Sequence, residues 1–493
     1  MTQEYEGFKK AGSFSFTKNE MEFQGELCLK EAATTLVLYS SSSFDWHTNV
    51  DIFGILYDRS KVSLINCVTM SSSSATRGNE LYSFSTIFPH FVIFGDQHIS
   101  SSCQIIRELS FTVNDAAALF YDFDAFGLVI DAKPYIEDIV EAIAKQQGRK
   151  IEIGEYPEIF YFTGKYEILS VDTALGKISV THCPSYQLPS PKGIYVDNSI
   201  TINIGFYSCQ SIDEAITSVL DILKFLEVIA GRPQNISDLV FWPISTQDHP
   251  KPLKVYWCMQ PQCEHDDNSD KLRPFDLPLQ AAINLDEFSD VLERWMERHN
   301  EWRDARARFS TAFAYQNSYN IDRIVGAANM FDILPACACP ESVTLLPDLA
   351  EARDNARKAF RALPLSPERD SILGALGRIG KATLKRKVRS RAKIITDVVN
   401  DRFPDLELVV DQAIDCRNYY VHGSNAKLDY SVHSAQVQFF TDTLEFIFAA
   451  SDLVESGWDI TAWIKRGSTM SHPFARYCFN YSQMLSDLKK ILE

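Results

Sequence analysis

The spacing of hydrophobic residues changes once along this chain, and the change constrains its fold more than any other feature of the sequence. From Gly12 to about Phe126, apolar and polar residues alternate with a period of two. Such alternation is typical of strands that bury one face. After about residue 276, apolar residues recur at three- and four-residue steps, which is typical of helices. The sequence therefore predicts an α+β fold, in which an antiparallel β-rich N-terminal region precedes an all-α helical bundle.

A second module is predicted between these two parts. Tyr135–Gln147 and Ser211–Ala230 have helical spacing, and the segments around them alternate again. A chain of 493 residues is also too long for one ordinary hydrophobic core. The polar, acidic stretch Cys263–Asp276 contains a proline and marks a boundary. We therefore predict a β-rich domain at 1–130, an α+β module at 131–264, a linker at 265–276 and a helical domain at 277–493.

Local patterns predict some elements in more detail. The serine clusters Ser71–Ser74 and Ser100–Ser102 are expected to be loops. The segment Glu287–Arg308 is dense in charge, with bulky apolar residues spaced along it, and is predicted to be one solvated helix. Val432–Leu453 has the spacing of a core helix. No phosphate-binding glycine loop, GxSxG or HExxH motif is present in the sequence.

The net charge of −17 is distributed unevenly along the chain. Residues 1–270 contain 19 Lys and Arg against 35 Asp and Glu, whereas residues 271–493 contain 29 against 30. A strongly acidic region is a poor partner for a phosphate backbone. A nucleic-acid site is therefore expected in the C-terminal part, provided that its basic residues cluster.

The basic residues cluster between Arg378 and Lys393, a segment without any acidic residue. A strip of one sign is typical of nucleic-acid binding, whereas a solvated helix face, which is the alternative, usually mixes both signs. We predict contact with RNA through the residues of this basic strip, namely Lys385, Arg386, Lys387, Arg389, Arg391 and Lys393. The strip contains no aromatic residue on which a base could stack. The stacking candidates are Tyr419, Tyr420, for which core packing is an equal alternative, and Tyr430.

The segment Asp415–Gly423 contains the candidate catalytic residues. Upstream and within it, apolar residues form one helical stripe consisting of Leu406, Val409, Val410, Ala413, Ile414, Tyr420 and Val421. Gly423 then ends the helix, as a left-handed residue would. Arg417 falls on the apolar stripe, where a guanidinium is costly to bury unless an anion meets it. His422 occupies the last turn, and an arginine beside a titratable histidine at a helix end suits phosphate chemistry.

The spacing Arg-x4-His in RNYYVHG, which closes one helix before another begins, resembles the signature of HEPN ribonucleases. Asp415 and Asn418 stand at the positions usual for that family, and a glycine and a long helix follow. The resemblance implies a four- to five-helix domain that pairs with a second copy. It also implies metal-independent cleavage of RNA by Arg417 and His422 without a cofactor. Asp415, Asn418 and Tyr419 are the expected supporting residues.

Other readings of the same pattern stay open. Arg294 and His299 also match Arg-x4-His, and Arg466 and His472 match with one more spacer. Both pairs are expected to be structural, the first on a solvated helix and the second in a Gly-Ser loop. Arg417 itself has a structural alternative, in which it pairs with a carboxylate while the histidine caps the helix.

Helix geometry favours a site shared by two chains. RNA cleavage by the ribose 2′-hydroxyl needs a base, an acid and a cation near the nonbridging oxygens. Five residues separate Arg417 and His422 by about 140° around a regular helix, so both are not expected to cover one phosphate from the same straight helix. Two helices packed across a twofold axis would supply both pairs. Asn418 is then expected to hold the imidazole, and Asp415 to meet the arginine of the second protomer.

The N-terminal part resembles the N-terminal domain of the ApeA family of bacterial antiphage proteins, which carry a C-terminal HEPN nuclease. The likeness rests on a short aromatic GSF opening at residues 12–14, a strand pair at Gly54–Leu64 that contains Lys-Val-Ser-Leu, and an FGDQHI strand at residues 94–99. The resemblance implies a role in abortive infection, in which the β-rich part senses a phage-derived trigger or regulates the nuclease.

No metal site is predicted. His249, Cys258, Cys263 and His265 could be proposed as zinc ligands, but their spacing fits no regular zinc knuckle. The eleven cysteines are odd in number and mostly lie in apolar runs, which indicates buried thiols in a reducing compartment. No apolar run approaches the length of a membrane-spanning helix. We therefore expect a cytoplasmic protein without a membrane partner.

Two functions from different classes remain from the sequence. The first is a HEPN endoribonuclease that cleaves host or phage RNA as a homodimer or a higher even oligomer. The second is a noncatalytic HEPN-like module for dimerisation and for binding a ligand or RNA. A cleavage assay in EDTA separates these two functions.

Overall fold

A computed structural model of the chain describes residues 7–16, 23–41, 50–78, 80–187, 191, 193–244, 251–261, 271–315, 318–342, 344–467 and 469–493. The chain divides into two compact units. The first consists of residues 1–222 and 234–293, and the second of residues 223–233 and 294–493. None of the helices in the described ranges is long and apolar enough to cross a lipid bilayer.

The first unit is built on a sheet of 13 strands, all paired antiparallel. In chain order they are β1 (Lys9–Ser15), β2 (Phe23–Cys28), β3 (Thr35–Ser40), β4 (Val50–Leu56), β5 (Lys61–Arg77), β6 (Glu80–Phe88), β7 (Phe91–Gly95), β8 (Ile106–Val113), β11 (Glu167–Thr173), β12 (Gly176–Tyr186), β13 (Val196–Gln210), β14 (Ile236–Pro243) and β15 (Leu253–Trp257). A separate two-stranded sheet pairs β9 (Phe126–Val129) with β10 (Ile159–Phe162). The short helix α1 (Ala116–Leu119) and the longer α2 (Lys133–Gln147) complete the connections between these strands.

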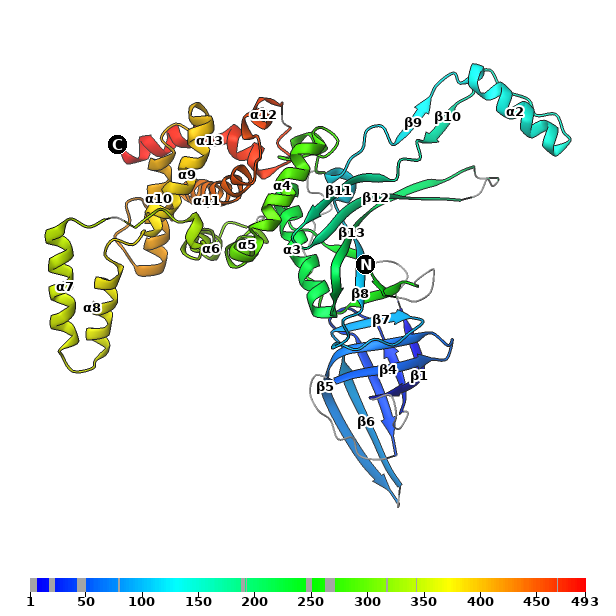
Figure 1. The fold of residues 1–493 in the computed structure, drawn as a ribbon, viewed down its shortest axis with the longest axis horizontal. Helices are drawn as coiled ribbons and strands as arrows, with labels where there is room; N and C mark the ends of the chain where they lie inside the picture. Colours follow the sequence, from blue (N-terminus) through cyan, green and yellow to red (C-terminus); the bar gives the residue numbers. More distant parts are fainter. Residues whose placement is uncertain are drawn as a thin grey trace. The chain divides into compact units, whose positions relative to one another are not determined.

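The first six strands close into a barrel, drawn in blue in Figure 1. β5 pairs with β4 through its first residues and with β6 through its later ones, which closes the ring β5-β4-β1-β2-β3-β6. Every second side chain points inward, and Phe14, Leu38 and Leu64 are completely buried there. Closure removes the exposed edges that an open sheet would present.

The rest of the sheet continues through β7 in the order β15, β14, β8, β13, β12 and β11. The helix α3 (Ile212–Ala230) follows β13 and begins with a capping box. In it, the Ser211 N–H and hydroxyl both donate to Glu214 at 2.8 Å, and the Glu214 N–H donates to the Ser211 hydroxyl at 3.4 Å.

The second unit is helical. Its helices include α5 (His299–Phe313), α6 (Ile321–Asp332), α7 (Pro347–Arg361), α8 (Pro367–Arg378), α9 (Leu384–Val399), α10 (Leu406–His422), α11 (Ser434–Glu455), α12 (Ile460–Lys465) and α13 (Pro473–Leu492), and α4 (Leu285–Glu297) leads into them. α11 is buried along most of its length, and it packs against α5, α6, α9, α10 and α13. It is therefore the central helix of this unit.

Buried arginines attach neighbouring helices to α11. Arg306 on α5 bonds both carboxylate oxygens of Asp452, at 2.8 and 3.1 Å. Arg323 on α6 bonds both oxygens of Glu445, at 2.9 and 2.8 Å. Each pair is bidentate and shielded from water, so loss of one partner would leave a charge buried without compensation.

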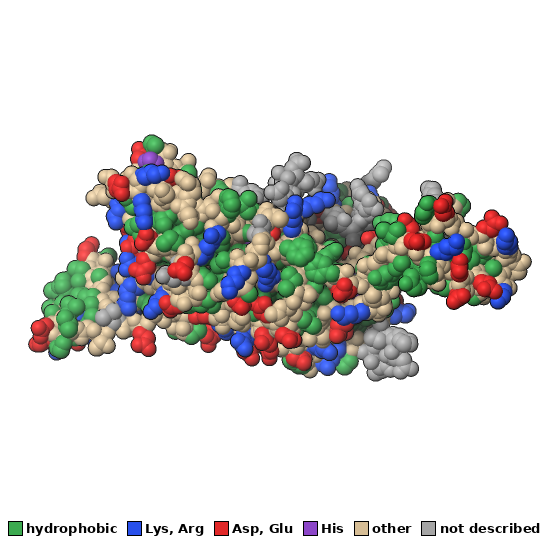
Figure 2. All heavy atoms as spheres, turned by 90° about the horizontal axis from the view of Figure 1, so that it is seen from above, with side chains coloured by type: hydrophobic (Ala, Val, Ile, Leu, Met, Phe, Trp, Pro, Cys, Tyr) green, Lys and Arg blue, Asp and Glu red, His purple; other side chains and the backbone are tan. Residues whose placement is uncertain are grey.

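The hairpin α7–α8 differs from the rest of the second unit, because neither helix has a buried residue. Hydrophobic side chains gather over these helices at the left end of the view in Figure 2. The exposed residues of this segment include Leu346, Leu349, Leu363, Leu365 and Ile372.

The α+β fold predicted from the sequence is confirmed, with an antiparallel β-rich region before the helical domain. The predicted segments at 131–264 and at 1–130 contribute strands to the same sheet, and the compact units divide the chain near residue 293. The bounds of the four predicted segments stay predictions.

Two local predictions are wrong. Ser71–Ser74 do not form a loop. They belong to β5, because their backbone pairs with β6 although the residues are exposed. Glu287–Arg308 is not one helix, because the chain breaks at Arg298 between α4 and α5. The break allows His299 and Trp302 to be buried rather than solvated.

Candidate active site

The C-terminal end of α10 is the framework of the candidate site. Gly423 follows the helix with φ of 65°, and its N–H bonds the carbonyl of Tyr419 at 3.0 Å. Glycine adopts this left-handed conformation without the steric cost of a Cβ, so the predicted helix end is confirmed. The apolar stripe is buried from Leu406 to Ile414, but Val421 is exposed because the last turn extends past the packed part of the helix.

Arg417 is held where α10 meets α6. Its Nη2 donates to Asn329 Oδ1 at 2.8 Å and lies 3.5 Å from a carboxylate oxygen of Asp332. Its Nη1 donates to Asn418 Oδ1 at 3.1 Å. Its Nε is buried and has no hydrogen-bond partner within the described residues. The guanidinium therefore keeps an unused donor, and its own chain satisfies it only in part.

His422 lies beside this guanidinium. Its Nε2 is 3.2 Å from Arg417 Nη1, and the residue is exposed. A guanidinium can only donate, so a hydrogen bond here requires a lone pair on Nε2 and places the ring proton on Nδ1. An unprotonated imidazole nitrogen is the form that a general base requires.

The expectation that Arg417 and His422 lie too far apart around one helix is wrong, because their side chains are in contact. The Cα–Cβ bonds of two helical residues five positions apart differ in direction by about 140°. That angle does not take into account how far a long arginine side chain reaches. The side chain bends around the end of α10 and meets the imidazole of the last helical residue. One chain therefore brings the cation and the histidine together.

The structural alternative for Arg417 is met in part by Asp332. That carboxylate forms the expected ion pair, but its side chain is 45% exposed. An exposed carboxylate exchanges readily with solvent, and a phosphate could take its place beside the guanidinium. His422 faces Arg417 rather than a helix carbonyl, so the alternative role as a C-cap does not describe its contact.

Asp415 is engaged by lysines of its own chain. Its Oδ1 is 3.3 Å from Lys385 Nζ, and its Oδ2 is 2.6 Å from Lys427 Nζ. The arginine of a second protomer would have to displace these ammonium groups. Asn418 also departs from expectation, since its side chain accepts from Arg417 instead of holding the imidazole.

The three tyrosines predicted as stacking candidates form one cluster with different exposures. The ring of Tyr419 lies 5.2 Å from those of Tyr420 and Tyr430. Tyr430 is buried, and burial raises the pKa of its hydroxyl. Tyr419 is 38% exposed, so it is the member of the cluster that presents its ring to solvent beside Arg417.

The basic strip on α9 is not free of acidic partners, as its sequence suggested. Arg389 Nε donates to Asp411 at 2.9 Å, and Lys385 lies 3.8 Å from Asp411 and 3.3 Å from Asp415. These carboxylates belong to α10, which packs against α9. A single-sign segment in the sequence thus becomes a mixed-sign surface after folding.

Arg391 does not belong to an RNA-binding surface. Only 1% of this residue is exposed. Its Nε donates to Ser451 Oγ at 2.9 Å, its Nη1 lies 2.8 Å from Glu455, and the guanidinium lies 4.9 Å from the ring centre of Trp302. The side chain therefore joins α9 to the core of the unit.

Other members of the strip keep charge available. Among the described residues, the side chains of Arg386 and Lys387 bond backbone carbonyls alone, those of Glu341 at 3.3 Å and Asp332 at 2.8 Å. A carbonyl leaves the positive charge uncompensated. Lys393 is exposed.

The two competing Arg-and-His matches lie in different surroundings. His299 is buried beside Arg306, at 3.3 Å, whereas Arg294 is exposed. His472 is completely buried, and its Nδ1 accepts from the N–H of Phe474 at the start of α13. Both histidines thus have positions in the interior of the unit.

Of the zinc ligands considered from the sequence, the described residues include Cys258. His249, Cys263 and His265 lie outside the residues that the structure describes. Cys258 is buried behind the end of β15, and burial raises the pKa of its thiol to about 12. A thiol with a raised pKa is a poor source of the thiolate that zinc requires.

Sequence reasoning missed Asn329, Asp332 and Lys427, which contact Arg417 and Asp415. One signal was available for Asn329, because it is an amide within the apolar sequence AANMF. A polar residue on an otherwise apolar helix face usually has a specific partner. Nothing in the sequence indicates which partner that is.

Comparisons with known proteins identify both parts of the chain. Residues 9–296 match the family model ApeA N-terminal domain 1, and residues 325–461 match the family model Apea-like HEPN. The second match contains α10, α11 and residues 325–332 of α6, and therefore Asn329 and Asp332 as well as Arg417 and His422. No curated protein and no solved structure matches the chain.

Proposed function

This chain belongs to the ApeA family, and we propose that its HEPN domain is a metal-independent endoribonuclease that acts in bacterial antiphage defence. The observation that carries the proposal is the contact of Arg417 with His422 at an exposed helix end. It joins a permanent cation and an exposed imidazole in one place.

The chemistry uses the substrate's own nucleophile. His422 Nε2 takes the proton of the ribose 2′-hydroxyl, whose oxygen then attacks the adjacent phosphorus. The bond from phosphorus to the 5′-oxygen breaks, and that oxygen takes up a proton as it leaves. Arg417 stabilises the charge on the nonbridging oxygens through its Nη atoms. The products are a 2′,3′-cyclic phosphate and a 5′-hydroxyl end.

The cleavage assay in EDTA tests this proposal against the noncatalytic alternative. Purified protein is expected to cut RNA with the chelator present and to leave these two kinds of end, which a phosphatase and a kinase distinguish. RNA of the same sequence with 2′-deoxyribose at every position is expected to stay intact. Binding without cleavage in the activated protein would favour the dimerisation and binding module instead.

The proposed assembly is a homodimer or a higher even oligomer. One His422 can serve as the base, but the leaving 5′-oxygen needs an acid, and a second histidine across a twofold axis would supply it. This argument depends on the number of proton-transfer groups and not on the angle between Arg417 and His422. The same proposal includes supporting roles for three residues. Asp415 binds Lys427, Asn418 binds Arg417, and Tyr419 offers an exposed ring to a base.

Mixed dimers test the sharing of the site. A wild-type protomer co-expressed with an Arg417→Ala/His422→Ala protomer, and purified through two different tags, is expected to cleave at less than about a tenth of the wild-type rate. The reason is that one lost proton-transfer group costs about 10²- to 10⁴-fold. The control pairs wild type with an Arg294→Ala protomer and should keep full activity. Retention of half the activity by the first dimer would show that each chain cleaves alone.

The RNA-binding surface is proposed to be the part of the basic strip whose charge is uncompensated, namely Arg386, Lys387 and Lys393. Lys385 and Arg389 are neutralised by Asp411 and Asp415, and they are expected to contribute less.

The salt dependence of RNA binding tests whether these three residues contact RNA. Changing Arg386, Lys387 and Lys393 together to Ser is expected to weaken RNA binding and to reduce the slope of log K against log salt by about 2, because each contact with single-stranded RNA contributes about 0.7. The control changes Lys465, Lys489 and Lys490 to Ser, which alters net charge equally. An unchanged slope in the first variant would remove the strip from the RNA interface.

The β-rich part is proposed to sense a phage-derived trigger or to regulate the nuclease in the cytoplasm. Its acidic composition makes it a poor RNA surface, so the trigger is expected to bind there while RNA binds the helical unit.

A further inference from the structure

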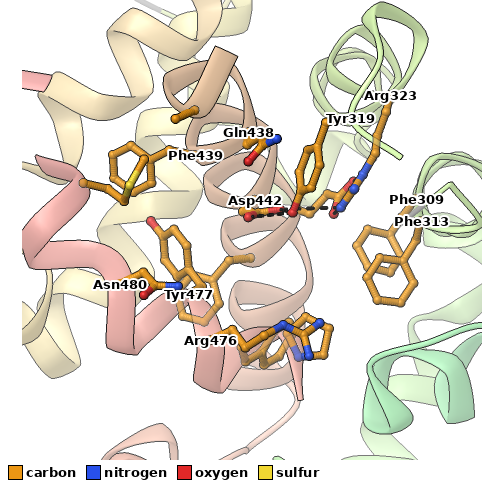
Figure 3. A pocket seen from close by; sticks show the side chains of 16 residues that line it. Phe309, Phe313, Tyr319, Arg323, Gln438, Phe439, Asp442, Arg476, Tyr477 and Asn480 are labelled. Atoms are coloured by element: carbon orange, nitrogen blue, oxygen red, sulfur yellow. Dashed lines mark hydrogen bonds and ion pairs between the residues drawn. The ribbon is translucent and has the colours of Figure 1, made fainter. Parts of the chain in front are cut away.

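A second site lies in the helical unit, on the side of α11 that faces α5, α6 and α13. It is a cavity of about 240 Å³ lined by residues from α5, α6, α11 and α13 (Figure 3). Ligand pockets for drug-sized molecules usually measure about 300–1,000 Å³. This cavity therefore has room for a single planar ring system rather than for a larger ligand.

The walls of the cavity are aromatic. Phe309 and Phe313 stack on each other at 5.0 Å on one side. Figure 3 shows Phe439 and Tyr477 on the opposite side, with Asp442 between the two groups. All four rings are buried, and Phe309 also stacks on Phe448 and Tyr477 on Phe403, so they border the cavity as apolar surface.

The interior of the cavity presents a carboxylate with spare acceptor capacity. Both oxygens of Asp442 accept from the Tyr319 hydroxyl, at 2.9 and 3.0 Å. A hydroxyl has only one proton, so it satisfies only a small part of a carboxylate that has about four lone-pair positions. Arg323 adds a contact to Asp442 at 3.5 Å, but its short bonds go to Glu445. The Asp442 side chain stays 34% exposed.

The charged side chains of the cavity limit which kind of ligand can bind to Asp442. The cavity contains two carboxylates, Asp442 and Glu445, and two guanidiniums, Arg323 and Arg476. A cationic ligand would therefore be repelled as much as attracted, whereas a neutral ring with N–H donors would not. Arg476 is exposed and bonds the carbonyls of Met470 and Ser471, both at 3.3 Å. Its charge acts on Asp442 without a direct ion pair among the described residues, so the guanidinium can also meet a phosphate at the rim of the cavity.

We propose that this cavity binds a guanine base, whose adjacent N1–H and N2–H groups donate to the two oxygens of Asp442 while the apolar border of the cavity contacts the ring. Guanine is the base that presents two neighbouring donors on its pairing edge, and a carboxylate accepts both at once. A 5′-phosphate attached to such a base would meet Arg476. The base could belong to a free guanine nucleotide or to an RNA, and the chemistry of the site is the same for both.

The site is distinct from the Arg417 centre, and its occupation does not depend on cleavage. Arg323 and Asn329 both belong to α6, and their Cα atoms are about 9 Å apart by helix rise. One helix therefore contributes residues to both sites.

Calorimetric titration of the full-length protein with four nucleotides tests the proposal. GMP is expected to bind at least about tenfold more tightly than AMP, CMP and UMP, because a site built for donors rejects ligands that lack them. IMP, which lacks the N2 amino group, is expected to bind more weakly than GMP. Equal binding of GMP and AMP, or no binding of GMP, would overturn the assignment. A guanine-containing tetradeoxynucleotide distinguishes a free nucleotide from a base within a strand, since it contains no 2′-hydroxyl to cleave.

Asp442→Asn tests the contact itself. The amide replaces one acceptor with a donor, so GMP affinity is expected to fall by about tenfold or more. The matched control is Asp401→Asn, an exposed aspartate of the same unit, which should leave affinity unchanged. Burial raises the pKa of Asp442 to about 7, so the fold disfavours its charge and should tolerate asparagine. GMP binding that survives in Asp442→Asn would contradict the proposed pairing.

The pH dependence of guanosine binding gives a readout in the unaltered protein. Asp442 must be ionised to accept both donors, so affinity is expected to rise as the pH increases through about 7. The other titratable groups facing the cavity are Tyr319, Arg323, Glu445, Arg476 and Tyr477. Burial raises the pKa of both tyrosines well above this range, and the guanidiniums stay charged. Burial also raises the pKa of Glu445, but its two oxygens bond Arg323 and not the ligand. Guanosine has no phosphate that titrates here, and a pH-independent affinity would contradict the role of Asp442.

Discussion

Arg417→Ala and His422→Ala are each expected to lower the rate of RNA cleavage by about a hundredfold or more. Removing one donor that stabilises transition-state charge costs about 10²–10³ in kcat, and removing a proton-transfer group costs about 10²–10⁴. The measurement is the initial rate on a labelled RNA at saturating concentration, in EDTA. Saturation separates the chemical step from RNA binding.

The fold is expected to survive both substitutions. His422 is exposed, so alanine removes little packing there. Arg417 is more buried, but its partner Asp332 is 45% exposed and can be solvated once the guanidinium is gone. Thermal unfolding of each variant should therefore stay close to wild type. A large loss of stability would make the rate uninformative, and Arg417→Lys then serves in its place.

Arg417→Lys separates charge from geometry. Lysine keeps the positive charge, but a single ammonium group cannot reproduce the planar fork that meets Asn329, Asn418 and His422 together. We expect this variant to recover only a small part of the lost rate. Full activity would mean that charge alone is needed at this position.

Arg294→Ala is the matched control, since Arg294 belongs to the other Arg-x4-His match and is exposed. It should retain wild-type activity. His299 is unsuitable as a control because it is buried beside Arg306, and its loss would disturb the core. Loss of cleavage in Arg294→Ala, with activity kept in Arg417→Ala, would move the active site to the start of the helical unit.

The fold class could be predicted because each half of the chain has one consistent period. Alternation over residues 12–126 produced strands, and three- and four-residue spacing after residue 276 produced helices. The register of these elements could not be predicted. The β5–β6 pairing that closes the barrel uses Ser71–Ser74, whose small polar side chains carry no period in the sequence.

The candidate site could be located but not assembled from the sequence. The helix end at Gly423 and the burial of the α10 stripe follow from local patterns. The contacts of Arg417 with Asn329 and Asp332 depend on how α6 crosses α10, which no local pattern specifies. The reach of the arginine side chain to His422 depends on rotamers, which sequence spacing does not specify either.

The basic strip shows that the sequence also could not specify which charged side chains are exposed. Its composition correctly marks a helix rich in cations, but composition does not say which face packs. Lys385 and Arg389 face carboxylates of α10, whereas Arg391 points into the core. Charge in a sequence therefore predicts a surface only after the packed face of the helix is known.

Arg391→Ala is expected to destabilise the helical unit by about 3–5 kcal/mol, the usual cost of breaking a buried ion pair. For a unit of this size, 1 kcal/mol shifts the melting temperature by about 2–4 °C, so a decrease of roughly 10 °C is expected. Differential scanning calorimetry measures it. The matched control is Lys393→Ala, on the same helix but exposed, which is expected to change stability by less than about 0.5 kcal/mol.

The size of the effect follows from what Arg391 holds together. Its guanidinium joins Ser451 and Glu455 of α11 and lies over the ring of Trp302, so alanine leaves a cavity and one less cation beside Glu455. Arg298 also pairs with Glu455, which keeps that carboxylate from being wholly uncompensated and places the cost at the lower end of the range. The two variants should have the opposite effects on RNA affinity. Lys393→Ala is expected to weaken RNA binding, whereas Arg391→Ala is expected to leave it unchanged at temperatures where the variant is folded. An Arg391→Ala protein with an unchanged melting temperature and weaker RNA binding would return this residue to the RNA surface that its sequence context first suggested.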